Sequence, residues 1–306
     1  MPVGPETSGV VEAGRTASAA PAALPATVDP SVARSWLLVP GSADGLAHRI
    51  AASAADVVVV DLEDGVAAAD KPAARDALAE AVGSGLRPWV RIADVASDHW
   101  SADVALLREC GPVAGVVLAK VESDRDVRTL HDALGGALPL VALVESARGI
   151  EAALEIAEAP GVTRLAFGSG DFRRDTGAAD DPLALLFARS RLVCASRAAG
   201  LPGPVDGPTV PRDPATLAEA SRHAASVGMT GRLCLREEQV ATVNAALSPS
   251  AVELAWARDV LETLERHGIR DGSDLPRIAR AEALLGAAEV FGLDADAAGR
   301  HRSDYA

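Results

Sequence analysis

The chain has 306 residues, of which 49% are hydrophobic, 24% are charged and 3% are aromatic, and its formal net charge is −14. This length allows one large domain or two small ones, with a sizeable core. The acidic balance argues against a duplex nucleic acid partner, because phosphate binding needs a concentrated basic surface, and the scarcity of aromatic rings argues against stacking on single strands.

Residues 1–30 are rich in Ala, Pro, Gly, Thr and Ser, and they lack a continuous apolar segment after a basic start. This composition favours a disordered N-terminal tail over a signal peptide. No stretch reaches the ~18 apolar residues that cross a membrane, so no membrane partner is expected. The three cysteines, Cys110, Cys194 and Cys234, are widely spaced. Each is expected to be a small buried hydrophobe, without disulfides, in the reducing cytoplasm.

From Ser35 onward, a short apolar run repeatedly ends in glycine or charged residues and is followed by an alanine-rich helical stretch. Such runs are too short and too continuous for half-exposed strands, and they predict parallel strands buried on both faces. The eight runs are SWLLVP (35–40), DVVVVD (56–61), PWVRI (88–92), GVVLAK (115–120), LPLVALVE (138–145), RLAFGS (164–169), GPVDGP (203–208) and GRLCLR (231–236).

Helical patterns separate these runs. Residues 69–82 carry alanine at helical spacing, with Pro72 where a first turn tolerates proline, and residues 182–200 end at Gly200, a residue type common just after a helix. Eight strand–helix units over about 210 residues predict an α/β fold, a (β/α)₈ TIM barrel, over residues 31–248. A doubly wound open sheet is the alternative that periodicity alone does not exclude.

The last part of the chain, residues 249–306, has a different pattern. A long amphipathic helical segment, 251–268, is followed by a loop and a second helical segment, 271–293. We expect a small helical appendage that serves as a lid or an oligomer contact.

Charged residues gather at the predicted C-terminal ends of the strands, where TIM barrels place their active sites. Glu145 and Asp171 stand at corresponding points of successive units. Two such carboxylates can share one hard cation, and an oxygen-only set with room for water suits Mg²⁺. Arg91 can hold a substrate carboxylate in a bidentate contact. The other residues at these ends are Asp61, Glu63, Asp64, Lys120, Glu122, Arg148, Gly168, Gly170 and Asp206.

Each of these residues also has a structural interpretation. A carboxylate at a strand end is often a helix N-cap or a solvated loop residue. Arg91 can belong to a structural ion pair, Asp206 can cap the turn that follows it, and Lys120 can pair with Glu122.

The sequence resembles the HpcH/HpaI aldolase/citrate lyase superfamily, and most closely its citrate lyase β-subunit-like (CoA ester lyase) proteins. The motifs "DLED", "VES" and "GSGDF" occur in family order and at family spacing. The full matching stretches, from about residue 34 to about 235, are RSWLLVPGS, VVVVDLEDGVAAADKPAAR, PWVRI, GVVLAKVES, LVALVESARGI, LAFGSGDF, LFARSRLVCASRAAGLPGPVDG and GMTGRLC.

The resemblance implies a TIM barrel with a C-terminal helical lid, assembled as a trimer or hexamer. It implies Mg²⁺ held by Glu145 and Asp171, with Arg91 on the substrate and Asp61 as a structural partner. The remaining implied roles are catalytic residues Glu63 and Asp64 near the metal waters, a lid aspartate Asp274 acting on a neighbouring subunit, and substrate contacts from Pro40, Gly41 and Gly170.

The implied reaction makes or breaks a carbon–carbon bond through a metal-stabilised enolate. The expected substrate is a β-hydroxyacyl thioester such as malyl- or citramalyl-CoA. Two departures from the family pattern bear on coenzyme A: no arginine follows the "VPG" turn, and Arg236-Glu237 replaces a His-Pro pair. The alternatives are therefore an aldolase for a free 2-oxo acid and a non-catalytic barrel subunit.

Overall fold

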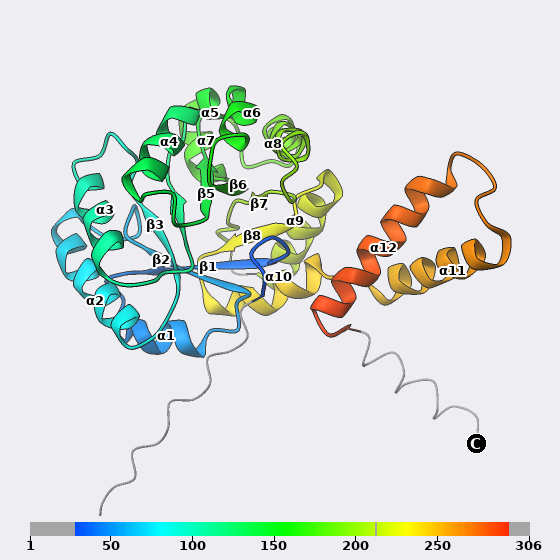
Figure 1. Ribbon diagram of the computed structural model, residues 1–306, viewed down its shortest axis with the longest axis horizontal. Helices are drawn as coiled ribbons and strands as arrows, with labels where there is room; N and C mark the ends of the chain where they lie inside the picture. Colours follow the sequence, from blue (N-terminus) through cyan, green and yellow to red (C-terminus); the bar gives the residue numbers. More distant parts are fainter. Residues whose placement is uncertain (1–27, 212, 294–306) are drawn as a thin grey trace, which may run out of the picture.

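The computed structural model describes residues 28–211 and 213–293, and its centre is a closed barrel of eight parallel strands in chain order (Figure 1). The closure between the last and first strands pairs Ser35 with Arg232 and Leu37 with Cys234. This confirms the predicted TIM barrel and excludes the open sheet. The strands are β1 Ser35–Pro40, β2 Val57–Asp61, β3 Trp89–Ile92, β4 Gly115–Leu118, β5 Leu140–Val144, β6 Val162–Phe167, β7 Val205–Asp206 and β8 Gly231–Cys234.

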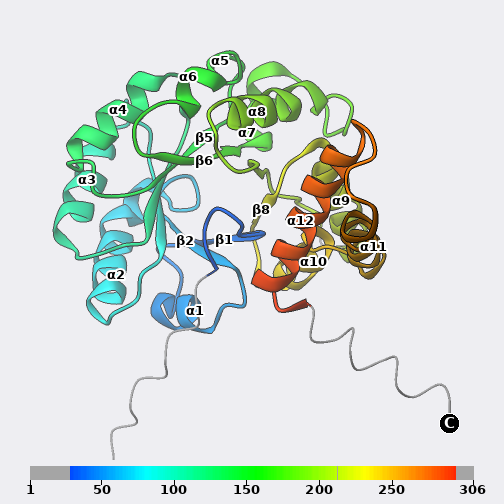
Figure 2. The same ribbon diagram turned by 45° about the vertical axis from the view of Figure 1, so that its right-hand side comes forward.

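Helices surround the barrel on its outside (Figure 2). Most of the predicted tail, residues 1–27, lies outside the described residues. The helices are α1 Leu46–Ala52, α2 Lys71–Gly83, α3 Trp100–Glu109, α4 Asp124–Ala133, α5 Ala147–Glu151, α6 Ala153–Ala157, α7 Ser169–Thr176, α8 Leu186–Ala198, α9 Pro214–Val227, α10 Val240–Leu247, α11 Ala251–His267 and α12 Asp274–Val290.

Strand alternation divides the core into two apolar clusters. One cluster lies between the sheet and the helices. The other fills the barrel interior with alternate strand residues, such as Val57 and Val59 of β2 and Val141 and Leu143 of β5. On each of these strands, the residue two positions further along therefore also faces the interior, at the carboxyl end of the barrel.

The N-terminal end of the interior is closed by large side chains. Trp36 and Trp89 pack edge to face, with ring centroids 5.2 Å apart. Arg164 is fully buried beside them and donates hydrogen bonds to the backbone oxygens of Pro30 and Gly203. These contacts leave the carboxyl end as the open end of the barrel interior.

The helices α11 and α12 form a hairpin that projects away from the barrel, with the loop between them at the far end (Figure 1). Its helices pack through a small cluster that includes Ala257, Val260 and Ala281. Its base is attached to the barrel by Arg34, which lies 3.7 Å from the Phe291 ring centroid and donates a hydrogen bond to Ser248. Whether this hairpin acts as a lid stays a prediction.

The cysteines are all free thiols. Cys234 is buried, as expected, whereas Cys110 is partly exposed and Cys194 is exposed on α8. The expectation that each is buried is wrong for Cys194, because it lies on the solvent side of an amphipathic helix. Among residues 28–211 and 213–293, no helix has the length and apolarity needed to cross a bilayer.

Candidate active site

Three polar side chains form the top layer of the barrel interior. Asp61 ends β2, Arg91 is its paired partner on β3, and Glu145 directly follows β5. Each continues the interior parity of its strand, since Val59, Trp89 and Leu143 belong to the interior cluster. The apolar interior thus ends in a charged layer at the end of the barrel where TIM-barrel enzymes carry out their chemistry.

Arg91 is anchored by Asp61. Its Nε and Nη2 donate to the two carboxylate oxygens at 2.8 and 2.6 Å, and its Nη1 lies 3.4 Å from Glu63. Asp61 also accepts hydrogen bonds from the backbone N–H groups of Glu63 and Gly65. Against the effect of burial, these carboxylates hold the pKa of Arg91 above its ordinary value. Asp61 is therefore a structural partner, and Nη1 is the end of Arg91 directed toward the other carboxylates.

Glu145 is buried at the centre of this layer, with 5% of its surface exposed. Its Oε1 accepts the backbone N–H of Lys120 at 2.8 Å. Burial, with a further contribution from the charge of Asp171, raises the pKa of Glu145 to about 8. Gly168 is required beside it, because a Cβ at that position would overlap the Glu145 carboxylate. Gly168 thus leaves room for the Glu145 carboxylate. Ionisation of this buried carboxylate is costly unless a cation lies beside it.

Asp171 lies on the first turn of α7, immediately after β6. A carboxylate is favoured at this end of a helix, where backbone N–H groups are unpaired. Its Oδ1 pairs with Arg174 Nη1 at 2.9 Å, and 24% of the Asp171 side chain is exposed. Glu145 and Asp171 follow neighbouring strands, since β5 pairs with β6 up to Val144 and Phe167, and the charge of Asp171 contributes to the raised pKa of Glu145.

Glu63 and Asp64 lie in the loop after β2, beside this pair. The loop is held by Lys71, whose ammonium donates to the backbone oxygens of Leu62 and Glu63 at 2.6 and 2.8 Å. The Lys120 ammonium pairs with Glu63 and lies 3.1 Å from Asp64. Burial raises the pKa of Glu63 although Arg91 and Lys120 oppose this shift.

The structural alternative for Lys120, an ion pair with Glu122, is not found. Lys120 pairs with Glu63 and Asp64 at the end of a different strand. Glu122 instead accepts a hydrogen bond from Ser146 and lies 3.6 Å from Arg148. A signal in the sequence is the position of Lys120 two residues after a buried strand, at the same end of the barrel as the other charged strand ends.

The structure also corrects the placement of Asp206. It does not belong to the charged layer, and it does not cap a turn. It is fully buried on the outer side of β7, 3.0 Å from Arg189 and 2.6 Å from Arg232. The preceding residue, Val205, belongs to the interior cluster, so Asp206 faces the helices. It is a structural ion pair between barrel and helix layer.

The predicted substrate-contact residues differ in their surroundings. Gly41 is buried, donates its N–H to the Asp61 backbone oxygen at 2.8 Å, and packs against Leu62. Pro40 is exposed at the end of β1. Gly170 has open space around the position of a Cβ. Gly170 is thus free to approach a ligand, whereas Gly41 has a packing role of its own.

Asp274 is the first residue of α12, at the end of the hairpin remote from the barrel (Figure 1). It accepts the backbone N–H of Arg270 at 2.8 Å, and hydrogen bonds from Arg270 and Asp271 lower its pKa. Within one chain it does not join the charged layer. A role in catalysis therefore requires a second copy, as the resemblance implies.

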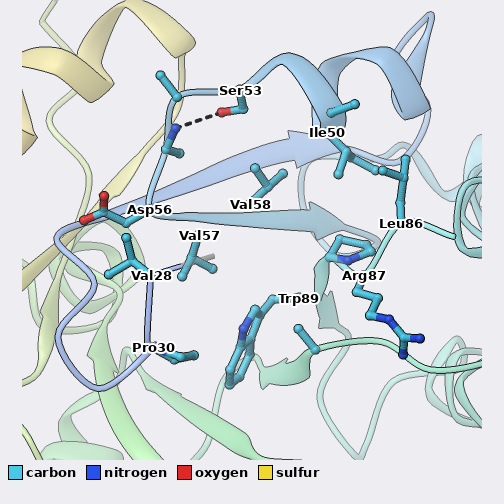
Figure 3. A pocket seen from close by; sticks show the side chains of 15 residues that line it. Val28, Pro30, Ile50, Ser53, Asp56, Val57, Val58, Leu86, Arg87 and Trp89 are labelled. Carbon is cyan, nitrogen blue, oxygen red and sulfur yellow. Dashed lines mark hydrogen bonds between the residues drawn. The ribbon is translucent and has the colours of Figure 1, made fainter. Parts of the chain in front are cut away.

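A pocket of about 640 Å³ opens at the opposite, N-terminal end of the barrel (Figure 3). Its lining is mainly apolar and includes Ile50, Val57, Leu86 and Trp89. The polar side chain of Asp56 at its edge is paired with Arg34 at 2.8 Å. Because this pocket lacks the charged layer, it is not the candidate active site.

The donor set at the carboxyl end fits a magnesium ion. Among the described residues, no three His, Cys, Asp or Glu side chains converge as a complete set of protein ligands. Glu145 and Asp171 instead offer two carboxylates with open space beside Gly170. Mg²⁺ is commonly held by one or two carboxylates and keeps several waters, which distinguishes it from ions that need a closed cage.

The sequence matches a known protein family over most of its length. Residues 34–236 match the model of the HpcH/HpaI aldolase/citrate lyase family. The chain belongs to this family. Residues 252–292, which contain most of the hairpin, match the HpcH/HpaI aldolase C-terminal domain. The predicted family is confirmed, and with it the prediction of a carbon–carbon lyase.

Several relatives are similar to this chain over nearly their whole length. The citrate lyase subunit beta-like protein of Deinococcus radiodurans is 31% identical over 84% of this chain and 97% of its own. The L-malyl-CoA/beta-methylmalyl-CoA lyase of Rhodobacter capsulatus is 31% identical over 84% of this chain and 95% of its own. The structure of CitE from Mycobacterium tuberculosis with magnesium, acetoacetate and coenzyme A has a TM-score of 0.72 and 33% identity, covering 85% of this chain and 99% of that one.

Proposed function

We propose that this chain is a Mg²⁺-dependent lyase that cleaves or forms a carbon–carbon bond in a short β-hydroxyacyl thioester. The observation that carries the proposal is the position of Glu145 and Asp171 at the ends of the paired strands β5 and β6, with Arg91 of β3 in the same layer as Glu145. Its relatives include a malyl-CoA lyase and a protein whose structure contains magnesium and coenzyme A.

The charge balance of the layer supports a divalent cation. Ion pairs and electrostatic contacts connect five carboxylates (Asp61, Glu63, Asp64, Glu145 and Asp171) with three cations (Arg91, Lys120 and Arg174). With all groups ionised, the cluster carries two net negative charges, which one Mg²⁺ neutralises. Burial raises the pKa of Glu145 although the charge of Arg91 opposes this shift, so a cation bound beside this carboxylate would favour its ionised form.

Each residue then has a role that follows from its position. Mg²⁺, when bound, supplies positive charge that stabilises a developing oxygen anion. Glu145 and Asp171 are the residues that hold the ion. Arg91 Nη1 presents further positive charge in the same layer, and Asp61 keeps the guanidinium in one orientation. Glu63 and Asp64, which Lys120 holds beside this layer, would orient water at the metal site.

Proton transfer to or from the substrate hydroxyl needs a further group. Asp274 lies at the remote end of the hairpin and carries a carboxylate of lowered pKa. We assign it to the site of a neighbouring copy in a homotrimer or hexamer, where the hairpin covers the open end of the barrel. This assembly explains why the hairpin projects away from its own barrel (Figure 1).

The free-acid alternative is favoured by one observation. After Gly41 the chain continues Ser42-Ala43, with no arginine at the turn to bind a nucleotide phosphate. An aldolase for a free 2-oxo acid needs no such contact. The same metal site serves both reactions, because both develop negative charge on an oxygen beside the broken bond.

The deciding experiment uses purified protein, Mg²⁺ and two sets of substrates, hydroxyacyl-CoA esters and free hydroxy-oxo acids, with products followed by mass spectrometry. Cleavage of a thioester supports the main proposal, and cleavage of free acids alone supports the alternative. Asp171→Ala is the control and should abolish both metal binding and turnover while the barrel still folds. Metal binding without turnover on either set would favour the non-catalytic barrel.

A further inference from the structure

Lys120 has an unusual backbone conformation. Its φ is 52°, and among the described residues it is the one non-glycine residue with a positive φ. This left-handed region is disfavoured for residues with a Cβ, and glycine is the residue that adopts it without strain. Such an outlier persists where the surrounding structure enforces it, and it often marks a functional position.

The neighbours of Lys120 show what enforces this conformation. The Ala119 N–H bonds to Ile92 of β3 at 3.3 Å, and the Val121 N–H bonds to Leu143 of β5 at 3.0 Å. The chain is therefore held by the strands on both sides. Ala119 belongs to the interior cluster, whereas Val121, two residues later, belongs to the outer one. The left-handed residue between them reverses the strand alternation.

This reversal directs two groups of one residue to two parts of the site. The backbone N–H of Lys120 donates to Glu145 Oε1 at 2.8 Å. Its ammonium pairs with Glu63 and lies 3.1 Å from Asp64. Glycine would satisfy the backbone without strain, but it would provide no ammonium. The presence of lysine at a glycine position is explained by the use of both groups.

We propose that Lys120 is a positioning residue that joins the metal-ligand side of the site to the Glu63–Asp64 side. The N–H fixes the rotamer of Glu145, and the ammonium keeps Glu63 and Asp64 apart from the metal position, where they orient water without binding the ion directly. This inference rests on the proposed function, since it assigns Glu145 to the metal.

The proposal separates metal binding from turnover. Loss of the ammonium leaves the cluster with three net negative charges in place of two, so Mg²⁺ binding should strengthen. The same loss frees Glu63 and Asp64 to move toward the ion, so turnover should fall. A lysine that merely stabilises the fold would weaken both properties together.

The experiment compares Lys120→Gly, Lys120→Met and Lys120→Arg with the wild-type protein. Calorimetry without substrate measures Mg²⁺ affinity at low and high salt. We expect Lys120→Gly and Lys120→Met to bind Mg²⁺ at least threefold more tightly at low salt, with the difference shrinking at high salt. Their kcat should fall at least tenfold, and Lys120→Arg should recover most of it. Lys120→Gly should unfold at a higher temperature than Lys120→Met, because glycine removes the backbone strain.

Arg148→Met is the matched control, because it removes one positive charge from the same end of the barrel. Arg148 is 77% exposed and lies 3.6 Å from Glu122, outside the site carboxylates. Its effect on Mg²⁺ affinity should be less than twofold. Equal kcat for wild type and Lys120→Met, or parallel loss of Mg²⁺ affinity and kcat, would overturn the proposal. If the wild-type protein shows no Mg²⁺-dependent turnover, the proposed function fails, and the Mg²⁺ affinities and unfolding temperatures alone then decide the role of Lys120.

Discussion

Arg91 and Asp61 face each other across neighbouring strands and are joined by two hydrogen bonds, 2.8 Å from Nε and 2.6 Å from Nη2. Both side chains are largely buried, at 11% and 3% exposed. The pair takes up two donors of the guanidinium and leaves Nη1 for Glu63 and for a ligand. The orientation of Arg91 therefore depends on a carboxylate that need not touch the substrate.

Asp61→Asn should destabilise the protein by about 3 kcal/mol, because removing one partner of a buried ion pair leaves the other charge uncompensated. Urea unfolding measures this change. The matched control is Asp124→Asn, which removes an exposed partner of Arg128 in a helix. That exposed pair is worth about 0.3–0.5 kcal/mol. A difference below about 1 kcal/mol between the two variants would show that Arg91 is held by other contacts.

The affinity for Mg²⁺ should increase with pH. The pKa of Glu145 is raised from 4.5 to about 8, so the metal-free protein carries a neutral Glu145 below that pH, and the ion must displace its proton. Affinity should rise up to about tenfold per pH unit below pH 8 and level off above it. Calorimetry at several pH values measures this slope. Glu145→Gln should bind weakly at every pH, and a flat profile for the wild-type protein would contradict the prediction.

The same shift affects the stability of the metal-free protein. The pKa of Glu145 is higher in the folded state than in the unfolded state. Protonation of Glu145 therefore stabilises the folded protein fully at low pH, and this stabilisation is lost as the pH rises toward about 8. Added Mg²⁺ should therefore raise the unfolding temperature more at pH 8.5 than at pH 6. Thermal unfolding with and without Mg²⁺ tests this, and an equal Mg²⁺ effect at both pH values would argue against Glu145 as a ligand.

Gly168→Ala should disrupt the metal site, because the added Cβ would overlap the Glu145 carboxylate. We expect a loss of about 1–3 kcal/mol in stability from overpacking and at least a tenfold loss in Mg²⁺ affinity. Gly83→Ala is the control, since nothing lies within 4 Å of a Cβ at that position near the end of α2. Unchanged Mg²⁺ binding in Gly168→Ala would mean that Glu145 can move aside without cost.

Asp206→Asn should reduce stability while leaving the turnover of the folded protein near the wild-type value. Its carboxylate is fully buried between Arg189 and Arg232, so the loss should be about 3–5 kcal/mol. Unfolding and steady-state kinetics at a temperature where the variant is folded separate the two effects. A large fall in kcat with normal stability would place Asp206 in the reaction, against the position of its side chain on the outer side of β7.

Much of the architecture follows from the sequence alone. The eight continuous apolar runs predict the eight strands, because a strand covered on both faces has no polar side to show. Helix boundaries such as Pro72 at the start of α2 and Gly200 just after α8 follow from the backbone conformations that these residues permit. The position of Glu145 and Asp171 at neighbouring strand ends was also predictable, since the ends of neighbouring parallel strands meet at one end of a barrel.

The direction of each charged side chain was decided by the tertiary structure. In a run that is apolar on both faces, the sequence does not show which parity is inside, so Asp206 looked like a residue of the active end although it faces the helices. Lys120 depends on the fold even more strongly. Its left-handed backbone is imposed by hydrogen bonds to β3 and β5, and only their closure into one barrel brings its ammonium to Glu63 and Asp64.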